Sequence, residues 1–173
     1  RRYCKYRDDR YCPWRMRQIM LNEAAIKELN EIRQKYPNAR AALLPALYIA
    51  QREFGHLSPE AYEAVSEILG VPKAIARGVA TFYVMYKHKP MGRNIVQLCT
   101  NVSCMILGAE KLVDFLKNKH GLEPGGTTSD GRFSMVIMEC IGACGTAPAM
   151  LVNDDFYENL TEDNIVKILE RYK

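Results

Sequence analysis

Several features that would assign a function class are missing from this sequence. No apolar run approaches the ~18–20 residues that a helix needs to cross a bilayer, and the richest one, residues 41–50, is short and contains Pro45. Neither a G-x-G-x-x-G motif nor a P-loop is present, so we do not expect the chain itself to bind a nucleotide cofactor. The N-terminal residues also lack the apolar segment of a secretory signal. These absences predict a chain without direct membrane insertion and without a nucleotide site of its own.

Basic charge is concentrated at one end of the chain. Residues 1–17 carry seven Arg and Lys side chains against two Asp, whereas the whole chain has a net charge of only +4. The remainder is therefore close to neutral. A nucleic-acid-binding domain would cluster its basic residues on one folded face. The charge pattern instead predicts a basic N-terminal tail, residues 1–19, and no nucleic-acid partner.

Histidine is scarce, and C-x-x-C is absent. The three histidines, His56, His88 and His120, stand apart from one another beside Gly or Lys, which favours surface or capping roles over metal ligation. The absence of C-x-x-C argues against a thiol–disulfide catalyst. Disulfide scaffolds are typical of shorter, secreted, loop-rich chains, whereas this one has 173 residues and regular helix and strand patterns. The six cysteines therefore favour metal ligation in a reducing compartment.

Residues 20–88 have the pattern of a small helical bundle. Four helices are expected: from Leu21 to before Tyr36, residues 39–54, from Pro59 to before Gly70, and from Pro72 onward. Asn38 and Ser58 are placed to cap the second and third of them. In the fourth, Tyr83 is expected to face inward together with Ala76. Nothing in this half indicates catalysis, so we interpret it as an assembly domain.

Residues 93–173 follow a different pattern. A polar segment with Pro90 and Gly92 is the best linker between the two halves. The elements expected after it are a strand at residues 94–98, a helix at 105–119, strands at 133–138 and 149–152, a return strand from Phe156, and a last helix capped by Thr161. This order predicts a compact α/β domain of thioredoxin-like type. The chain as a whole is then α+β, a small helical bundle followed by that domain.

Four cysteines follow two of the expected strands. They form two pairs, Cys99-Thr-Asn-Val-Ser-Cys104 and Cys140-Ile-Gly-Ala-Cys144, each in a loop. If the two strands are neighbours in one sheet, their C-terminal loops meet and the four thiols converge. A four-thiolate metal site needs this arrangement.

More than one centre is compatible with four thiolates. Two ferric ions, two sulfides and four thiolates sum to a charge of about −2, and Gly142 and Gly145 would let backbone N–H groups approach closely enough to offset it. Structural zinc also accepts two to four residues between cysteines. We favour a [2Fe–2S] cluster because the first loop is wide and the histidines that often accompany zinc are absent. Four buried cysteines without a metal are a further alternative, but such cysteines would rarely fall in two loop pairs beside glycine.

Longer segments resemble the small thioredoxin-like [2Fe–2S] subunit of respiratory NADH:quinone oxidoreductase (complex I). The resemblance covers roughly residues 20–173 and is carried by Ala42-Leu-Leu-Pro-Ala-Leu, Val79-Ala-Thr-Phe-Tyr-Val-Met-Tyr, Gln97-Leu-Cys-Thr, Glu139-Cys-Ile-Gly-Ala-Cys, Ala147-Pro-Ala-Met and Asp155-Phe-Tyr-Glu-Asn-Leu-Thr. It implies a helical domain followed by a thioredoxin-like ferredoxin domain, with the cluster ligands at Cys99, Cys104, Cys140 and Cys144. The basic segment with Cys4, Cys12 and Trp14 has no counterpart in it.

The resemblance also implies a role and a location. A subunit of this kind carries one electron beside a flavoprotein subunit that binds FMN and NADH, together with other subunits of the peripheral arm, on the cytoplasmic face of the inner membrane. The chain would then contribute to an oxidoreductase without catalysing a reaction alone. Related subunits serve NAD(P)-linked hydrogenases and formate dehydrogenases, which are alternatives here. A zinc-stabilised binding module is the least favoured alternative.

Overall fold

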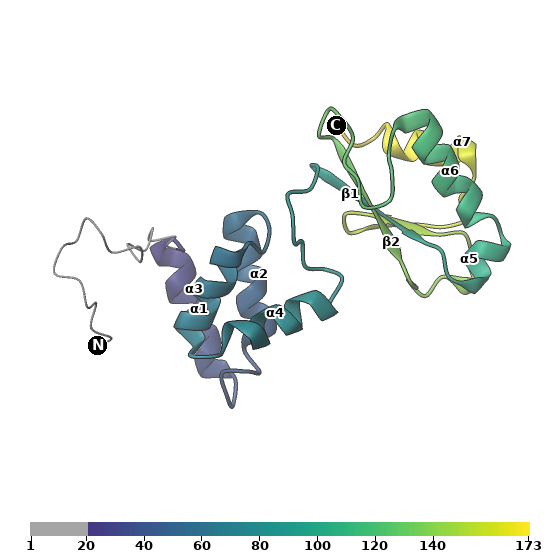
Figure 1. The fold of residues 1–173 in the computed structure, drawn as a ribbon. Helices are drawn as coiled ribbons and strands as arrows, with labels where there is room; N and C mark the ends of the chain where they lie inside the picture. The colour runs from purple at the N-terminus through teal and green to yellow at the C-terminus, as the bar shows by residue number, and fades with distance from the viewer. Residues whose placement is uncertain (1–20) are drawn as a thin grey trace. The chain divides into compact units, whose positions relative to one another are not determined.

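The structure, a computed structural model, describes residues 21–173 (Figure 1). The predicted basic tail, with Cys4 and Cys12, lies outside the described residues. The chain divides into two compact units between Pro90 and Met91. Within the described residues, the first unit is helical and the second combines a sheet with helices, which confirms the predicted α+β class. No helix in residues 21–173 has the length and apolar character to cross a membrane.

The first unit, which we call the helical unit, is built from four helices. They are α1 (Glu23–Lys35), α2 (Leu43–Phe54), α3 (Pro59–Leu69) and α4 (Lys73–Phe82). Their apolar faces meet in one core that contains Leu29, Leu47, Val65 and Ala76. The predicted cap at Ser58 is confirmed, since its hydroxyl accepts the Ala61 N–H at 3.3 Å. Local sequence signals therefore account for most of this unit.

Two expectations about this unit were wrong in detail. The second helix begins at Leu43, not at residue 39, because the Asn38 side chain accepts the Ala41 N–H at 3.0 Å and closes a turn instead of capping the helix. Tyr83 was expected inside but is 37% exposed. It follows the last residue of α4 with an extended backbone, so helical spacing no longer governs where its side chain lies.

The segment after α4 is bound back onto the helical unit. The buried ring of Tyr86 donates its hydroxyl proton to the Leu44 carbonyl at 2.8 Å. Gln51 accepts the Lys87 N–H at 2.5 Å, and the Lys87 carbonyl accepts the Leu57 N–H at 2.7 Å. Both backbone groups of Lys87 are therefore satisfied within this unit, which holds the chain in place up to the start of the predicted linker.

The second unit, the C-terminal unit, is a four-stranded mixed sheet with helices. Its elements are β1 (Asn94–Cys99), α5 (Val102–Ile106), α6 (Ala109–His120), β2 (Phe133–Met138), a 3₁₀ turn (Cys144–Thr146), β3 (Met150–Val152), β4 (Asp155–Tyr157) and α7 (Glu162–Leu169). The strand order is β2-β1-β3-β4, with β1 and β2 parallel and the other pairs antiparallel. Leu98 and Met135 on one face of the sheet share a core with Leu116 of α6 and Ile165 of α7. Helices α6 and α7 thus cover the same face (Figure 1).

The expected helix at residues 105–119 is two helices. Gly108, at φ +97°, breaks the path between α5 and α6 in a conformation that only glycine adopts easily. Met105 was expected on the buried face of one long helix but is 44% exposed on α5. The break therefore turns the apolar residues before Gly108 away from the core that α6 completes.

Candidate metal centre

The first cysteine pair is held by the end of β1 and by α5. Cys99 is the last residue of β1, its N–H bonds to the Ala149 carbonyl at 3.1 Å, and its side chain is only 3% exposed. Cys104 lies inside α5 and is equally buried. The Asn101 side chain accepts the Val102 N–H at 2.7 Å and so starts α5 directly after the strand. Regular secondary structure therefore positions both thiols.

The second pair lies in the loop after β2. In the parallel register Cys99 is opposite Met138, the last residue of β2, so both strands end at the same edge of the sheet. Cys140 follows Met138 by two residues, and Cys144 opens the short 3₁₀ turn. Both of these cysteines are exposed, unlike the first pair. Gly142 between them has φ +82°, which lets the loop turn sharply.

The two pairs lie close enough to influence each other's ionisation. Burial acts to raise the pKa of Cys99, but hydrogen bonding from the Asn101 and Ile141 backbone and interactions with the Cys104 and Cys140 thiols outweigh it, so the pKa is lowered. The Cys99 thiol also lies 3.9 Å from the Glu139 carbonyl oxygen. The loop after β2 therefore reaches the thiol at the end of β1.

Cys104 is shifted in the opposite direction. Burial raises its pKa, and the interaction with Cys99 raises it further, while hydrogen bonding from the Ala149 backbone acts against both. The charge of Cys144 contributes to the same increase. Each member of the buried pair thus interacts with one member of the exposed pair. In a shared low-dielectric site, one of two neighbouring thiols ionises more readily than the other.

The donor set fits a thiolate-bound centre. All four cysteines are free, and two of them form a small buried cluster with Ala109. Within residues 21–173, no three His, Cys, Asp or Glu side chains are grouped around the position of a single metal ion. Soft thiolate donors without nearby histidine or carboxylate ligands suit iron–sulfur clusters or zinc. A cluster with two irons shares four thiolates between two metals, so its ligands do not need to meet at one point.

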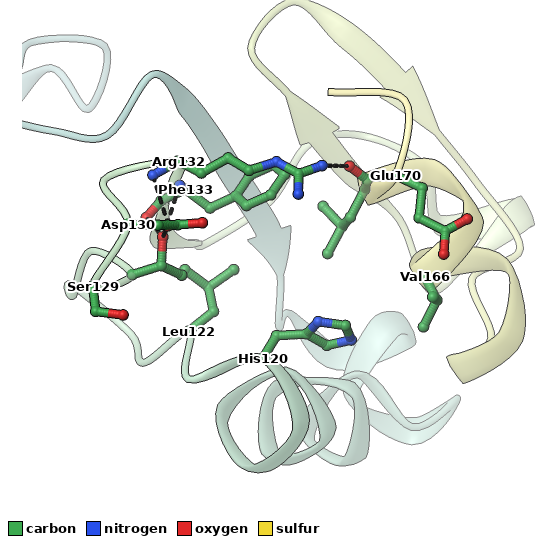
Figure 2. A pocket seen from close by; sticks show the side chains of 10 residues that line it. His120, Leu122, Ser129, Asp130, Arg132, Phe133, Val166 and Glu170 are labelled. Carbon is green, nitrogen blue, oxygen red and sulfur yellow. Dashed lines mark hydrogen bonds between the residues drawn. The ribbon is translucent and has the colours of Figure 1, made fainter. Parts of the chain in front are cut away.

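A pocket of about 260 Å³ lies at the other end of β2, beside Phe133 and α7 (Figure 2). Figure 2 shows the Arg132 guanidinium reaching across it to α7, where Nη2 donates to the Leu169 carbonyl at 2.9 Å. Its Nε donates to the Tyr172 carbonyl at 2.6 Å. Arg132 is thus used to hold the last carbonyls of the chain. The pocket is separated from the cysteines by the length of a strand, and we assign no chemistry to it.

The sequence expectations missed some features beside the cysteines. Asn101 was not recognised as the cap of α5, although an Asn immediately before a short helix is a common signal. The exposed apolar side chains of α5 were missed for a different reason, because a continuous helical pattern suggested a buried face. Ile106 is 73% exposed and Leu107 is 57% exposed.

Comparison with known proteins supports the interpretation of this site. The family model described as "Thioredoxin-like [2Fe-2S] ferredoxin" matches residues 29–173. The chain belongs to this family. The match confirms the thioredoxin-like type of the C-terminal unit and the predicted family resemblance. Proteins of this family are ferredoxins, so an iron–sulfur centre is the group that the four cysteines are expected to hold.

Several relatives extend the match over most of the chain. A component of the NADH-quinone oxidoreductase of Rhizobium meliloti is 42% identical over 147 residues, which are 85% of this chain and 88% of the relative. NADH dehydrogenase (ubiquinone) flavoprotein 2, mitochondrial, of Dictyostelium discoideum is 39% identical over 84% of this chain and 60% of its own length. Both are named as parts of an oxidoreductase, in agreement with the predicted class.

A solved structure gives a similar fold in another enzyme. It is the crystal structure of an NAD⁺-reducing [NiFe]-hydrogenase in the air-oxidized state, with a TM-score of 0.64 and 26% identity. The match covers 75% of this chain but only 22% of the hydrogenase chain. The same module therefore occurs there within a much longer polypeptide.

Proposed function

We propose that this chain is a one-electron carrier that holds a [2Fe–2S] cluster on Cys99, Cys104, Cys140 and Cys144. The observation that supports it most is the parallel register that pairs Cys99 with Met138 and so ends both strands at one edge of the sheet. This register brings two cysteine pairs, far apart in sequence, into mutual electrostatic contact. Membership of a ferredoxin family gives that thiol group its metal chemistry.

The chain's own residues would prepare the site in three ways. The burial of Cys99 and Cys104 excludes water from one side of the centre. Backbone groups of Asn101, Ile141 and Ala149 lie where they can offset negative charge on the thiolates. The loop with Gly142 can adjust to the second pair of ligands. A bound cluster would supply the one-electron redox chemistry.

The wider role that we propose is that of a subunit of NADH:quinone oxidoreductase. In it the chain would lie next to the flavoprotein subunit that binds FMN and NADH, with the other peripheral-arm subunits, on the cytoplasmic face of the inner membrane. The names of the Rhizobium and Dictyostelium relatives support this assignment. Residues 93–173 would then carry the electron, and residues 20–88 would serve assembly, since the helical unit contains none of the four cysteines.

Metal analysis and cysteine variants test the proposed centre. Protein purified without oxygen should be red-brown and contain iron and acid-labile sulfide in equal amounts. Serine at any of the four proposed ligands should weaken or abolish the visible spectrum. Cys4→Ser and Cys12→Ser are matched controls and should leave it unchanged. Zinc without sulfide, or loss of the spectrum in the Cys12 variant, would overturn the proposed ligand set.

A fragment tests the division of labour between the units. A chain of residues 92–173 should keep the cluster signal in electron paramagnetic resonance after reduction, because all four cysteines and a separate core lie there. It should lose stable association with the flavoprotein subunit in a pull-down assay. Equal binding by the fragment would assign docking to the C-terminal unit alone. Loss of the cluster would show that the two units fold as one.

A subunit of an NAD-linked hydrogenase is the second candidate. The solved hydrogenase structure favours it, because its chain contains a module of the same fold. The site would hold the same cluster in either complex, so cluster analysis does not separate the two. Identification of the proteins that copurify with the chain does: a nickel-containing subunit would replace the first assignment, whereas quinone-reducing partners would support it.

A further inference from the structure

One short helix of the C-terminal unit presents apolar side chains to solvent. We call these the α5 patch: Val102, Met105, Ile106 and Leu107, which are 60%, 44%, 73% and 57% exposed. Cys104, in the same helix, is buried. Scattered exposed apolar residues are ordinary, but a contiguous group on one short element indicates a surface that another molecule covers. Helix α5 thus joins the proposed cluster ligand on one side to an uncovered apolar surface on the other.

Only carboxylates provide side-chain charge in the segments around this patch. Residues 94–110 and 133–166 contain no Lys, Arg or His. Three exposed carboxylates lie close to the cysteines along the chain or through contacts. Glu110 lies in the first turn of α6, Glu139 precedes Cys140, and Glu158 accepts a hydrogen bond from the Thr146 hydroxyl at 2.5 Å. The apolar patch therefore has an acidic surround, which we call the acidic rim.

We propose that the α5 patch and the acidic rim form the docking surface through which the site exchanges electrons with its redox partner. The proposal rests on the function proposed above. Its occupant is a protein that carries a flavin close to its surface and presents an apolar contact area surrounded by Lys and Arg. One electron leaves the partner's reduced flavin and is taken up at the four-cysteine site, with no bond made or broken.

The choice of occupant follows from exposure and charge. Cys140 and Cys144 are the exposed members of the site, so a partner's cofactor approaches the centre most closely from their side. A centre with four thiolates is itself negative, and it adds to the field of the rim. Complementary charge increases the rate of productive encounter and rejects partners of the same sign. An acidic or uncharged partner surface would gain no such advantage here.

The size of the patch sets its part in the interface. A stable protein interface buries roughly 800 Å² on each partner, more than four side chains can supply. The α5 patch would therefore be the centre of a larger contact, where a few residues carry most of the binding free energy. This is compatible with a major contribution from the helical unit, whose Phe82 is 79% exposed.

Charge substitutions in the patch test the proposal. The affinity of the full-length, cluster-containing chain for the FMN-containing subunit of the same organism is measured by calorimetry. Ile106→Asp should weaken it about thirtyfold or more, the loss typical of a central interface residue. Phe156→Asp is the matched control, because Phe156 is 45% exposed on β4 of the same unit, and it should change the affinity less than about threefold. Glu110→Gln should slow association severalfold at low salt and have little effect at high salt.

The visible spectrum of each protein separates the possible failures. If the native chain contains zinc and no sulfide, the proposed function fails, and the inference fails with it. If the cluster is present and Ile106→Asp binds like the native chain, the docking surface is refuted while the proposed function stands. Equal weakening by Phe156→Asp also refutes it. If Ile106→Asp loses its cluster, Ile106→Ser replaces it, and an unchanged affinity in that variant refutes the surface.

Discussion

Removal of the Ser134 hydroxyl should destabilise the C-terminal unit selectively. Ser134 lies on β2, opposite to the core face, yet its side chain is fully buried. Its Oγ accepts the Gly92 N–H at 2.7 Å and lies 2.6 Å from the Thr127 hydroxyl. One side chain thus ties the start of the unit and the loop before β2 to the same strand. Alanine in its place removes both bonds at once.

The expected magnitude follows from which partner can find water. Gly92 is packed against backbone, since a Cβ added to it would lie 2.9 Å from the Phe133 carbonyl carbon and 3.0 Å from the Gly131 oxygen. Its N–H therefore has little room to reach another acceptor. A buried donor left without a partner costs about 1–3 kcal/mol. Thr127 is exposed and can turn its hydroxyl to solvent, so the free energy of unfolding should fall by about 1–3 kcal/mol in total.

Hydrogen exchange measured by mass spectrometry can detect this loss in each unit separately. Amides of β1 and β2 should exchange about 5 to 150 times faster in Ser134→Ala, because 1.4 kcal/mol corresponds to a factor of ten. Amides of α1 to α4 provide an internal reference and should not change. Thr127→Val removes only the exposed partner and should accelerate exchange less than about threefold. Exchange within twofold of the native rate in Ser134→Ala would refute the reasoning.

Three further substitutions have defined outcomes. Ser58→Ala removes the cap of α3 and should lower the free energy of unfolding of the helical unit by about 0.5–2 kcal/mol in urea denaturation. Leu116→Ala opens a cavity between α6 and the sheet and should destabilise the C-terminal unit by about 2–5 kcal/mol, measured by loss of the cluster absorbance on heating. Gly108→Ala forces a side chain into a left-handed conformation at a cost of about 1–2 kcal/mol; because it displaces α5, the iron content per chain should also fall.

Elements with strong local signals could be predicted from the sequence. The bounds of β2 agree with the alternation from Phe133 to Met138, and α3 begins and ends at its cap residues, Ser58 and Gly70. Asn38 gave the wrong start for α2, because an Asn side chain can close a turn as readily as it caps a helix. Such a choice depends on packing further along the chain, which a local pattern does not contain.

The environment of the cysteines could be predicted only in part. That each pair follows a strand was visible, but the parallel pairing of β1 with β2 depends on the whole sheet. The break at Gly108 was hidden because apolar residues continue on both sides of it. A periodic pattern identifies apolar side chains but does not identify what covers them. For Ile106 and Leu107, no part of the C-terminal unit's core does.

The two cysteine pairs differ in how firmly the fold holds them, and this difference has a chemical consequence. Cys99 cannot shift without breaking its bond to the Ala149 carbonyl, and Cys104 cannot shift without moving α5. Cys140 and Cys144 lie in a loop that bends at Gly142 and is open to solvent. A site with one rigid, buried pair and one adaptable, exposed pair can fix the position of a bound group while still admitting it from solvent. Four ligands on rigid elements would need every distance to be right before the group arrived, and four on loops would define no position at all.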